Sequence, residues 1–194
     1  LKKVGRGQIV VLGFLPTNLR DVGGIDTFLS FLSSLKVKSV ANAGNRDVNV
    51  IERVSPNGSA LLYLSNLSGE DVETSISFID PGKSSKVTKI PRVKIAKRSA
   101  IAWPINLKTE LGEIKYLTSE ITRIQHRCND EIVIHAWGYE GTNGKVAVDL
   151  KGQKKRAEEK LYKHSAKGET LEFRNAKGTI KIIVEGMKLL SDLP

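Results

Sequence analysis

Hydrophobic and polar residues alternate along most of this chain, in short runs separated by turn residues. The stretch SALLYLSNLSGEDVETSISF at 59–78 contains two alternating apolar runs on either side of the polar segment Ser65–Glu73. A period of two residues is typical of strands that bury one face. We therefore expect a strand, a charged turn and a return strand here. Asn66 is expected to hydrogen-bond local backbone in this turn rather than a ligand.

The same rhythm continues through residues 40–105, where no helical period is present. An apolar strand pattern at 48–54 precedes the turn Ser55–Gly58, and short apolar pieces follow at 87–90, 93–95 and 100–103. Prolines and charged residues separate these pieces, and Pro104 ends the series. Turn signals at intervals of about ten residues indicate an antiparallel β-sandwich.

Short strands are also expected beyond Pro104, with two turns between them. The expected strands are 114–117, 121–124, 132–137, 145–150, 171–173 and 179–184, and the turns are 138–144 and 175–178. The glycines of the 138–144 turn are interpreted as residues that relieve positive-φ strain. Residues 154–163 fit either a short helix or a basic strand, and 186–194 either a helical turn or a frayed end.

The first residues follow a different pattern. A Gly5–Gln8 turn followed by Ile9–Leu12 predicts a hairpin ending in a buried strand, and apolar residues at helical spacing predict a helix within 24–35. One strand and one helix are too little for a core, so residues 1–38 resemble the closing unit of an α/β domain. The first residue is not methionine, and we expect a piece of a longer polypeptide.

The predicted fold is therefore mainly β, with antiparallel sandwich domains after a short strand–helix remnant of an α/β domain. We expect the remnant at 1–38 and a β-sandwich at 39–104. Residues 105–194 are either a second β-rich domain or a continuation of the sandwich.

Composition narrows the function classes. The 194 residues are 40% hydrophobic and 27% charged, which is enough apolar sequence for compact domains with real cores. No apolar stretch approaches the roughly 20 residues needed to cross a bilayer. We expect no membrane partner. The single cysteine, Cys128, cannot form an internal disulfide, and this fits a reducing, cytoplasmic location.

The formal net charge of +10 raises the question of a nucleic-acid partner. Positive residues are spread along the chain except in the basic segment 151–163. A nucleic-acid site would interleave aromatic residues with the charges, but Tyr162 is the single aromatic there and Glu158 and Glu159 interrupt the run. A solvated face is the favoured interpretation, and the lysine-rich surface hints at a heat-loving source.

Candidate chemistry is sparse. Three adjacent carboxylate pairs, Glu70–Asp71, Asp130–Glu131 and Glu158–Glu159, lie in polar stretches where nothing indicates the desolvated pocket that a raised pKa requires. The three histidines, His126, His135 and His164, lack metal-ligand spacing. We therefore expect no catalytic residue, no metal ligand and no cofactor.

Flat aromatic side chains offer a route to carbohydrate binding, because sugar rings stack on apolar faces. The residues singled out for carbohydrate contact are Trp137, Tyr139 and Trp103. Trp137 and Tyr139 are two residues apart, so they share one face of an extended strand. Packing in the core is the alternative role for all three.

Several motifs, taken in order, resemble a known family. VGRGQIVVLGFLPTN at 4–18 resembles the last strand of the α/β domain that follows the catalytic barrel in multidomain β-galactosidases. RSAIAWPINLKTELGEIKYLTSEITRI at 98–124 resembles a segment of archaeal and bacterial family 35 glycoside hydrolases, which include β-galactosidases and exo-β-glucosaminidases. EIVIHAWGYEGTNGKVAVDL at 131–150 is similar to the region that follows. The resemblance covers roughly residues 4–150.

This resemblance implies a parent enzyme whose two catalytic glutamates lie on a barrel that precedes Leu1. No residue here inherits either role, although Tyr116 and Glu120 match the 98–124 motif. The expectation is a noncatalytic fragment that packs against the rest of the parent glycosidase, shapes the active-site entrance or mediates homo-oligomerisation. A self-standing carbohydrate-binding module and a basic nucleic-acid adaptor are the alternatives.

Overall fold

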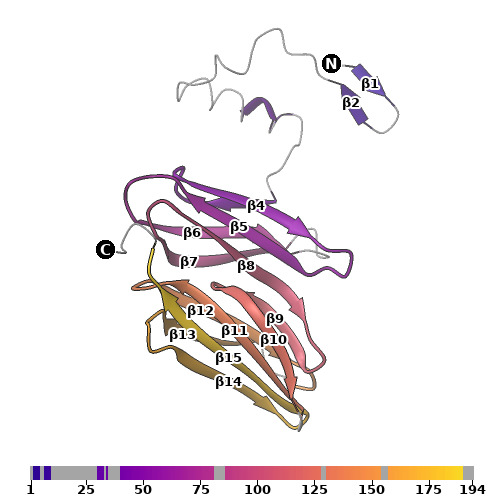
Figure 1. The fold of residues 1–194 in the computed structure, drawn as a ribbon. Coiled ribbons are helices and arrows are strands. Elements are labelled where there is room, and N and C mark those ends of the chain that lie inside the picture. The colour runs from indigo at the N-terminus through magenta and orange to yellow at the C-terminus, as the bar shows by residue number, and fades with distance from the viewer. Residues whose placement is uncertain are drawn as a thin grey trace. The chain divides into compact units, whose positions relative to one another are not determined.

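The computed structural model describes residues 2–4, 7–9, 30–32, 34, 40–80, 86–127, 130–153 and 157–189 (Figure 1). The chain forms two compact units, Leu1–Ser39 and Val40–Pro194. The division falls one residue beyond the expected end of the first segment.

The first unit contains an antiparallel hairpin. Its strands are β1 (Lys2–Val4) and β2 (Gly7–Ile9), with Lys2 opposite Ile9. The expected hairpin is confirmed, but Gly7 and Gln8, which we expected in its turn, belong to β2. Residues 30–32 and 34 are helical, inside the expected helix at 24–35. The other residues of that helix and the strand residues 10–12 lie outside the described residues.

The second unit consists of β-strands in its described part, and the expected mainly β, sandwich-like fold is confirmed. Its strands are β3 (Ala41–Ala43), β4 (Val48–Val54), β5 (Ala60–Asn66), β6 (Val72–Ile79), β7 (Val87–Ile95), β8 (Ser99–Lys108), β9 (Gly112–Leu117), β10 (Glu120–Arg127), β11 (Glu131–Tyr139), β12 (Asn143–Leu150), β13 (Glu158–Lys163), β14 (Glu169–Asn175) and β15 (Gly178–Met187).

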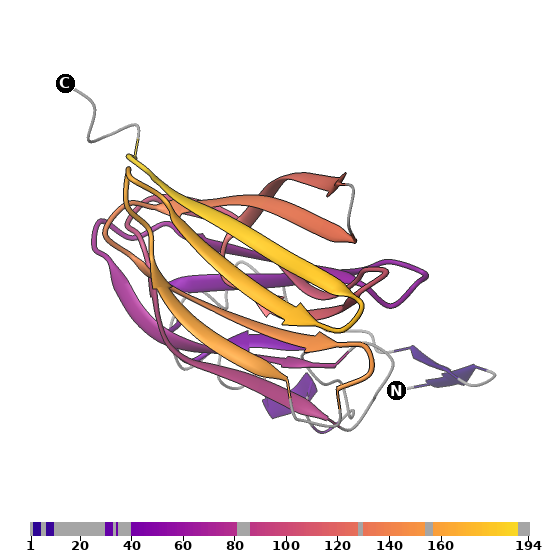
Figure 2. The same ribbon diagram turned by 90° about the horizontal axis from the view of Figure 1, so that it is seen from below.

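These strands form three sheets (Figures 1 and 2). A six-stranded sheet has the order β13-β12-β9-β8-β5-β4, a three-stranded sheet the order β3-β6-β7, and a four-stranded sheet the order β10-β11-β15-β14. Neighbouring strands run antiparallel except β11 and β15, which are parallel.

The six-stranded sheet is the middle layer. Along β12, Ala147 packs in a first hydrophobic core with residues of β6 and β7, whereas Val146 and Val148 pack in a second core with residues of β11, β14 and β15. Successive residues of a strand point to opposite faces. The three-stranded and four-stranded sheets therefore cover opposite faces of the middle sheet. The expected boundary at residue 104 lies inside β8, and the middle sheet contributes side chains to both cores. Residues 105–194 therefore continue the sandwich that begins at residue 40.

Strand β8 changes the face that it buries at Asn106. Trp103 and Ile105 lie in the first core, whereas Leu107 packs against the second. Asn106 has a φ of 49°, a left-handed conformation that asparagine adopts more readily than most residues. Its buried Nδ2 donates to Asp80 Oδ1 at 2.6 Å. This local reversal allows one strand to contribute to both cores.

Two prolines do not interrupt the strands as the sequence suggested. Pro91 lies inside β7, an edge strand, and Pro104 lies inside β8. Edge positions tolerate the missing N–H of proline. N–H groups two residues apart along a strand point to the same side, so the nitrogen of Pro104 is on the same side of β8 as the N–H of Ala102. The Ala102 N–H donates to a side chain and not to a neighbouring strand. The missing N–H of Pro104 therefore costs no hydrogen bond between strands.

The glycine-rich turn is shorter than we expected. Gly138 lies in β11 and Gly144 in β12, which leaves residues 140–142 as the turn, with Gly141 at a φ of 79°. The relief of positive-φ strain is therefore the wrong explanation for Gly138 and Gly144. A Cβ on either would fall within 3.0 Å of a ring, that of His164 or Tyr162 respectively. These glycines make room for rings.

The structure decides in part between the alternatives that the sequence left for residues 154–163 and 186–194. Residues 158–163 form β13, so the strand alternative holds for that part, and 154–156 lie outside the described residues. At the C-terminal end, Gly186 and Met187 belong to β15, and residues 190–194 are not among those described.

Asn66 behaves as expected. Its side chain is fully buried, and Nδ2 donates to the carbonyl oxygens of Glu70 at 2.8 Å, Ala96 at 3.1 Å and Ile95 at 3.3 Å. Its Oδ1 accepts from the Ser68 N–H at 3.0 Å and the Ser68 hydroxyl at 2.7 Å. The predicted bonding to local backbone is confirmed, and the same amide also ties this turn to the end of β7.

Candidate functional site

One part of the middle sheet has an apolar face that no strand in the described part of the second unit covers. Leu62 and Leu64 of β5 are buried in the first core, so Leu61 and Tyr63 point to the opposite face. The exposed fractions there are 38% for Leu61, 45% for Tyr63 and 56% for Ile51 of the adjacent β4. This bare face extends over β4, β5 and the first half of β8.

A groove of about 480 Å³ runs between the bare face and β10. Arg53 lines it, and its apolar lining consists of Val54, Ala60, Leu61, Pro104, Leu107, Ile121 and Ile124. Ile121 and Ile124 come from β10, whereas the other apolar residues come from β4, β5 and β8. The groove therefore lies along the boundary between two sheets.

A second hollow of about 240 Å³ lies on the same face and is more polar. Asn49, Ser65 and Glu120 contribute polar atoms to it, and Tyr63 contributes an aromatic ring. Polar groups beside an exposed ring are a combination that suits a hydroxylated ligand.

Two side chains close the free edge of β8 beside this hollow. Glu120 Oε2 accepts from the Ala102 N–H at 3.1 Å, and the Tyr139 hydroxyl donates to the Ala100 carbonyl at 2.8 Å. Strand β9 pairs with β8 only from Ile105 onward. The carboxylate and the phenol thus satisfy backbone groups that a neighbouring strand would otherwise satisfy.

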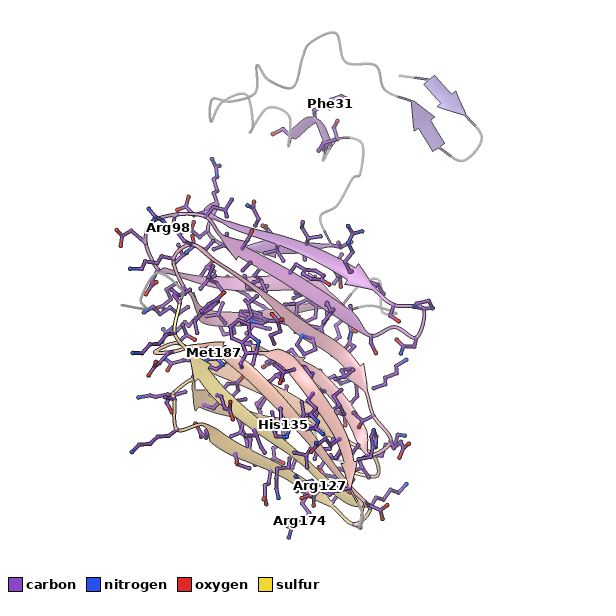
Figure 3. The ribbon with its side chains drawn as sticks, in the orientation of Figure 1. Phe31, Arg98, Arg127, His135, Arg174 and Met187 are labelled. Atoms are coloured by element: carbon purple, nitrogen blue, oxygen red, sulfur yellow. The ribbon has the colours of Figure 1, made fainter. Side chains whose placement is uncertain are left out.

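The free edge of β10 is different, because it borders the groove. Strand β10 pairs with β11 on one side, and no strand in the described part of the chain pairs with its other side. Arg123 and Arg127 are exposed on it, and Ile124 is 42% exposed. Figure 3 shows Arg127 near one end of this region, with His135 on the adjacent strand β11.

The three aromatic residues singled out from the sequence differ in their burial. Trp137 and Tyr139 lie on one face of β11 and are half-buried, with ring centroids 5.3 Å apart and planes at 88°. An edge-to-face pair does not offer a sugar two coplanar rings. Trp103 is 3% exposed in the first core, where packing, the alternative left open for it, accounts for its burial.

A buried polar cluster has the residue types of a nucleophile and a base. Ser119 Oγ lies 2.7 Å from both His164 Nε2 and the Tyr162 hydroxyl, and His164 Nδ1 lies 2.9 Å from Thr142 Oγ1. Burial lowers the pKa of His164 and raises that of Tyr162 to about 12. Ser119 is completely buried, so no substrate reaches its hydroxyl in this arrangement. The cluster ties Tyr162 of β13 and the adjacent His164 to the β9–β10 turn through Ser119 and to the β11–β12 turn through Thr142.

One carboxylate in each of two of the pairs, Asp71 and Glu131, has its pKa shifted in the direction opposite to that of a general acid. A hydrogen bond from Lys94 and another from the Lys97 N–H lower the pKa of Asp71. Lys181, 2.9 Å away, does the same for Glu131. Glu158 forms an ion pair with Lys160 at 3.2 Å.

The other sequence candidates are dispersed. His126 lies on exposed β10, His135 on β11 and His164 in the buried cluster, while Cys128 and residues 154–156 of the basic segment lie outside the described residues. Among the residues that the structure describes, no group of three or more histidine, cysteine or acidic side chains is arranged to hold a metal ion. Across the same residues, no helix is long and apolar enough to cross a membrane.

Sequence reasoning did not single out the residues of the bare face. The signal was present in Leu61–Leu64, where four successive large apolar residues interrupt strict alternation. Such a run indicates a strand with apolar side chains on both faces. Comparison with protein-family models and with curated proteins found no match to this chain.

Proposed function

We propose that this chain is a noncatalytic, β-rich C-terminal part of a β-galactosidase-like glycoside hydrolase. Its role there is to scaffold the catalytic barrel, which hydrolyses terminal β-glycosides with two carboxylates of its own. The observation that carries the proposal is the bare apolar face with its groove, because exposed patches of this kind mark interaction surfaces.

The segment that carries the sequence resemblance also lines the groove. The most distinctive motif, 98–124, comprises β8, β9 and the first part of β10, which include Pro104, Leu107, Ile121 and Ile124 of the groove lining. A segment that the resemblance places in a glycosidase thus also builds the surface available for packing. Its half-buried Glu120 has a structural partner, the Ala102 N–H.

Scaffolding fits better than self-association. A chain with a net charge of +10 is repelled by a second copy of itself, and Arg53 adds a positive charge to the lining of the groove. The single cysteine supports a cytoplasmic location for the assembled enzyme.

The reading frame upstream of Leu1 provides the direct test. The proposal requires a (β/α)₈ pattern there, with a glutamate at the end of each of two strands. The purified 194-residue chain is expected not to hydrolyse nitrophenyl β-galactoside. Hydrolysis by the chain alone, or an upstream sequence without such a barrel, would show that the proposal is wrong.

A second candidate function, a carbohydrate-binding module, is favoured by the polar hollow at Tyr63. Titration with galactosides and chitosan oligomers, followed by intrinsic fluorescence, tests it. Saturable quenching that is lost in Tyr63→Ala but kept in Leu161→Ala, a change at an exposed site on β13, would support sugar binding at this hollow.

A further inference from the structure

We propose that β10 receives an extended segment of the neighbouring domain as an added β-strand, with apolar side chains in the groove and acidic side chains against the arginines. This inference rests on the proposed function and specifies the chemistry of the partner. Addition of a strand to an open sheet edge is a recurrent mode of peptide recognition.

The backbone of β10 supplies the first argument. Its pairing with β11 extends from Glu120 to Arg127, and its outer edge has no strand partner among the described residues. Unpaired N–H and C=O groups along an edge are a template for another strand. The edge of β8, by contrast, is already occupied by Glu120 and Tyr139. Of the edges of β8 and β10, the one that remains open is therefore that of β10.

The groove supplies the second argument. A strand added to β10 lies about 4.8 Å from it, and packed sheets are about 10 Å apart. Such a strand therefore extends the four-stranded sheet over the bare face of β8, β5 and β4. Its inward side chains meet Leu61 and Pro104, with Ile121 and Ile124 beside them. Every second residue of the segment is accordingly apolar.

Charge supplies the third argument. Arg53 lines the groove and makes no ion pair in the described part of the chain, and Arg123 projects from the exposed side of β10. Arg127 lies 3.7 Å from Glu131, but that carboxylate also contacts Lys181 at 2.9 Å. An added strand would therefore meet Arg53 in the groove, and Arg123 and Arg127 on the opposite, outer face of β10. This positive excess favours an acidic segment over a second, equally basic copy.

A displayed library of nine-residue peptides, selected against the full 194-residue chain, tests the predicted partner chemistry. The selected sequences are expected to alternate apolar with acidic residues. The best peptide is then synthesised with a fluorescent label, and its affinity is measured by anisotropy. Absence of enrichment, or selection of basic or non-alternating peptides, would overturn the proposal.

Matched variants test the location. Leu61→Glu places a charge in the groove, and Leu161→Glu makes the same change at a leucine that is 72% exposed on β13. We expect at least a tenfold loss of peptide affinity in the first and no change in the second. Ile124→Glu repeats the test from β10 if Leu61→Glu does not fold. Equal affinities in the folded groove variants and the control contradict the assignment.

Backbone methylation of the peptide tests the strand itself. N-methyl groups on one alternate set of residues face β10 and abolish binding, whereas those on the other set face away and leave it intact. Equal tolerance of both sets would mean groove binding without strand addition.

Sedimentation tests the alternative occupant, a second copy of this chain. A dimer that Ile124→Glu dissociates would show that a second copy, and not the acidic segment, occupies the edge of β10. The upstream reading frame tests the proposed function separately, so the two failures are distinguishable.

Discussion

The ring of Tyr162 occupies the space that a side chain on Gly144 would need. A Cβ built on Gly144 falls within 3.0 Å of three atoms of that ring. The two residues are opposite one another in the β12–β13 pairing, and the Tyr162 hydroxyl continues the contact to Ser119 at 2.7 Å. Because Gly144 has no side chain, β12 leaves room for the buried ring of Tyr162 on β13.

We expect Gly144→Ala to destabilise the fold for this reason. The ring is almost completely buried, so its displacement strains the second core, at a cost of about 1–3 kcal/mol in the free energy of unfolding. Urea denaturation followed by tryptophan fluorescence measures the change. Gly69→Ala is the control, because a Cβ there meets no atom within 4 Å. Equal stabilities of the two variants would show that the close approach has no energetic consequence.

Much of the fold was accessible from the sequence because alternation reports burial directly. The strands around Leu62 and Ile182 were predicted from the period of their apolar residues. The roles of Gly138 and Gly144 were not, since the rings that require them belong to Tyr162 of β13 and to His164 directly after it, and nothing in a local pattern indicates that contact. The layering was equally hidden, because it depends on the reversal at Asn106.

The candidate site was less predictable for a related reason. Trp137 and Tyr139 share a face of β11, as their spacing indicated, but the edge-to-face angle between their rings is set by packing. The bare face could be inferred from Leu61–Leu64, whereas its exposure depends on where the four-stranded sheet ends. The four-stranded sheet ends at β10, and this end is set by the pairing of distant strands rather than by any local pattern.

The buried histidine predicts a pH dependence of stability. Burial lowers the pKa of His164 below that of an unfolded histidine, so the unfolded chain binds the proton first as the pH falls. The stability contributed by the neutral ring is present above about pH 6.5, the ordinary histidine pKa, and is lost below it. The free energy of unfolding should therefore fall between pH 7.5 and 5.5.

A comparison of two variants isolates this effect from other titrating groups. His164→Gln removes the buried imidazole, and its stability should depend less on pH over the same range. His126→Gln changes an exposed histidine on β10 and should retain the full dependence. Urea denaturation at each pH provides the measurement. An unchanged pH profile in His164→Gln would mean that the buried ring does not govern it.

Asn66→Asp should be destabilising despite its nearly identical size. The amide Nδ2 donates to carbonyl oxygens of Glu70, Ile95 and Ala96, and a carboxylate oxygen would instead face them as a second acceptor. Loss of a buried donor costs about 1–3 kcal/mol, and more where a charge is buried. Chemical denaturation at pH 7 measures the loss. Asn49→Asp, an exposed change on β4, should have little effect, and similar losses in both would contradict the argument.

Glu120→Ala should loosen the free edge of β8 without unfolding the protein. The Ala102 N–H loses a charged acceptor at 3.1 Å, and hydrogen bonds to charged groups contribute about 1.5–3 kcal/mol. Exchange of the Ala102 amide, followed by NMR in deuterated water, should therefore accelerate roughly ten- to hundredfold. Glu120→Gln retains an acceptor oxygen and should preserve much of the protection. The Ile101 amide points to the opposite side of β8 and serves as the internal reference. If both amides accelerate together in Glu120→Ala, the carboxylate stabilises the whole strand rather than closing its edge.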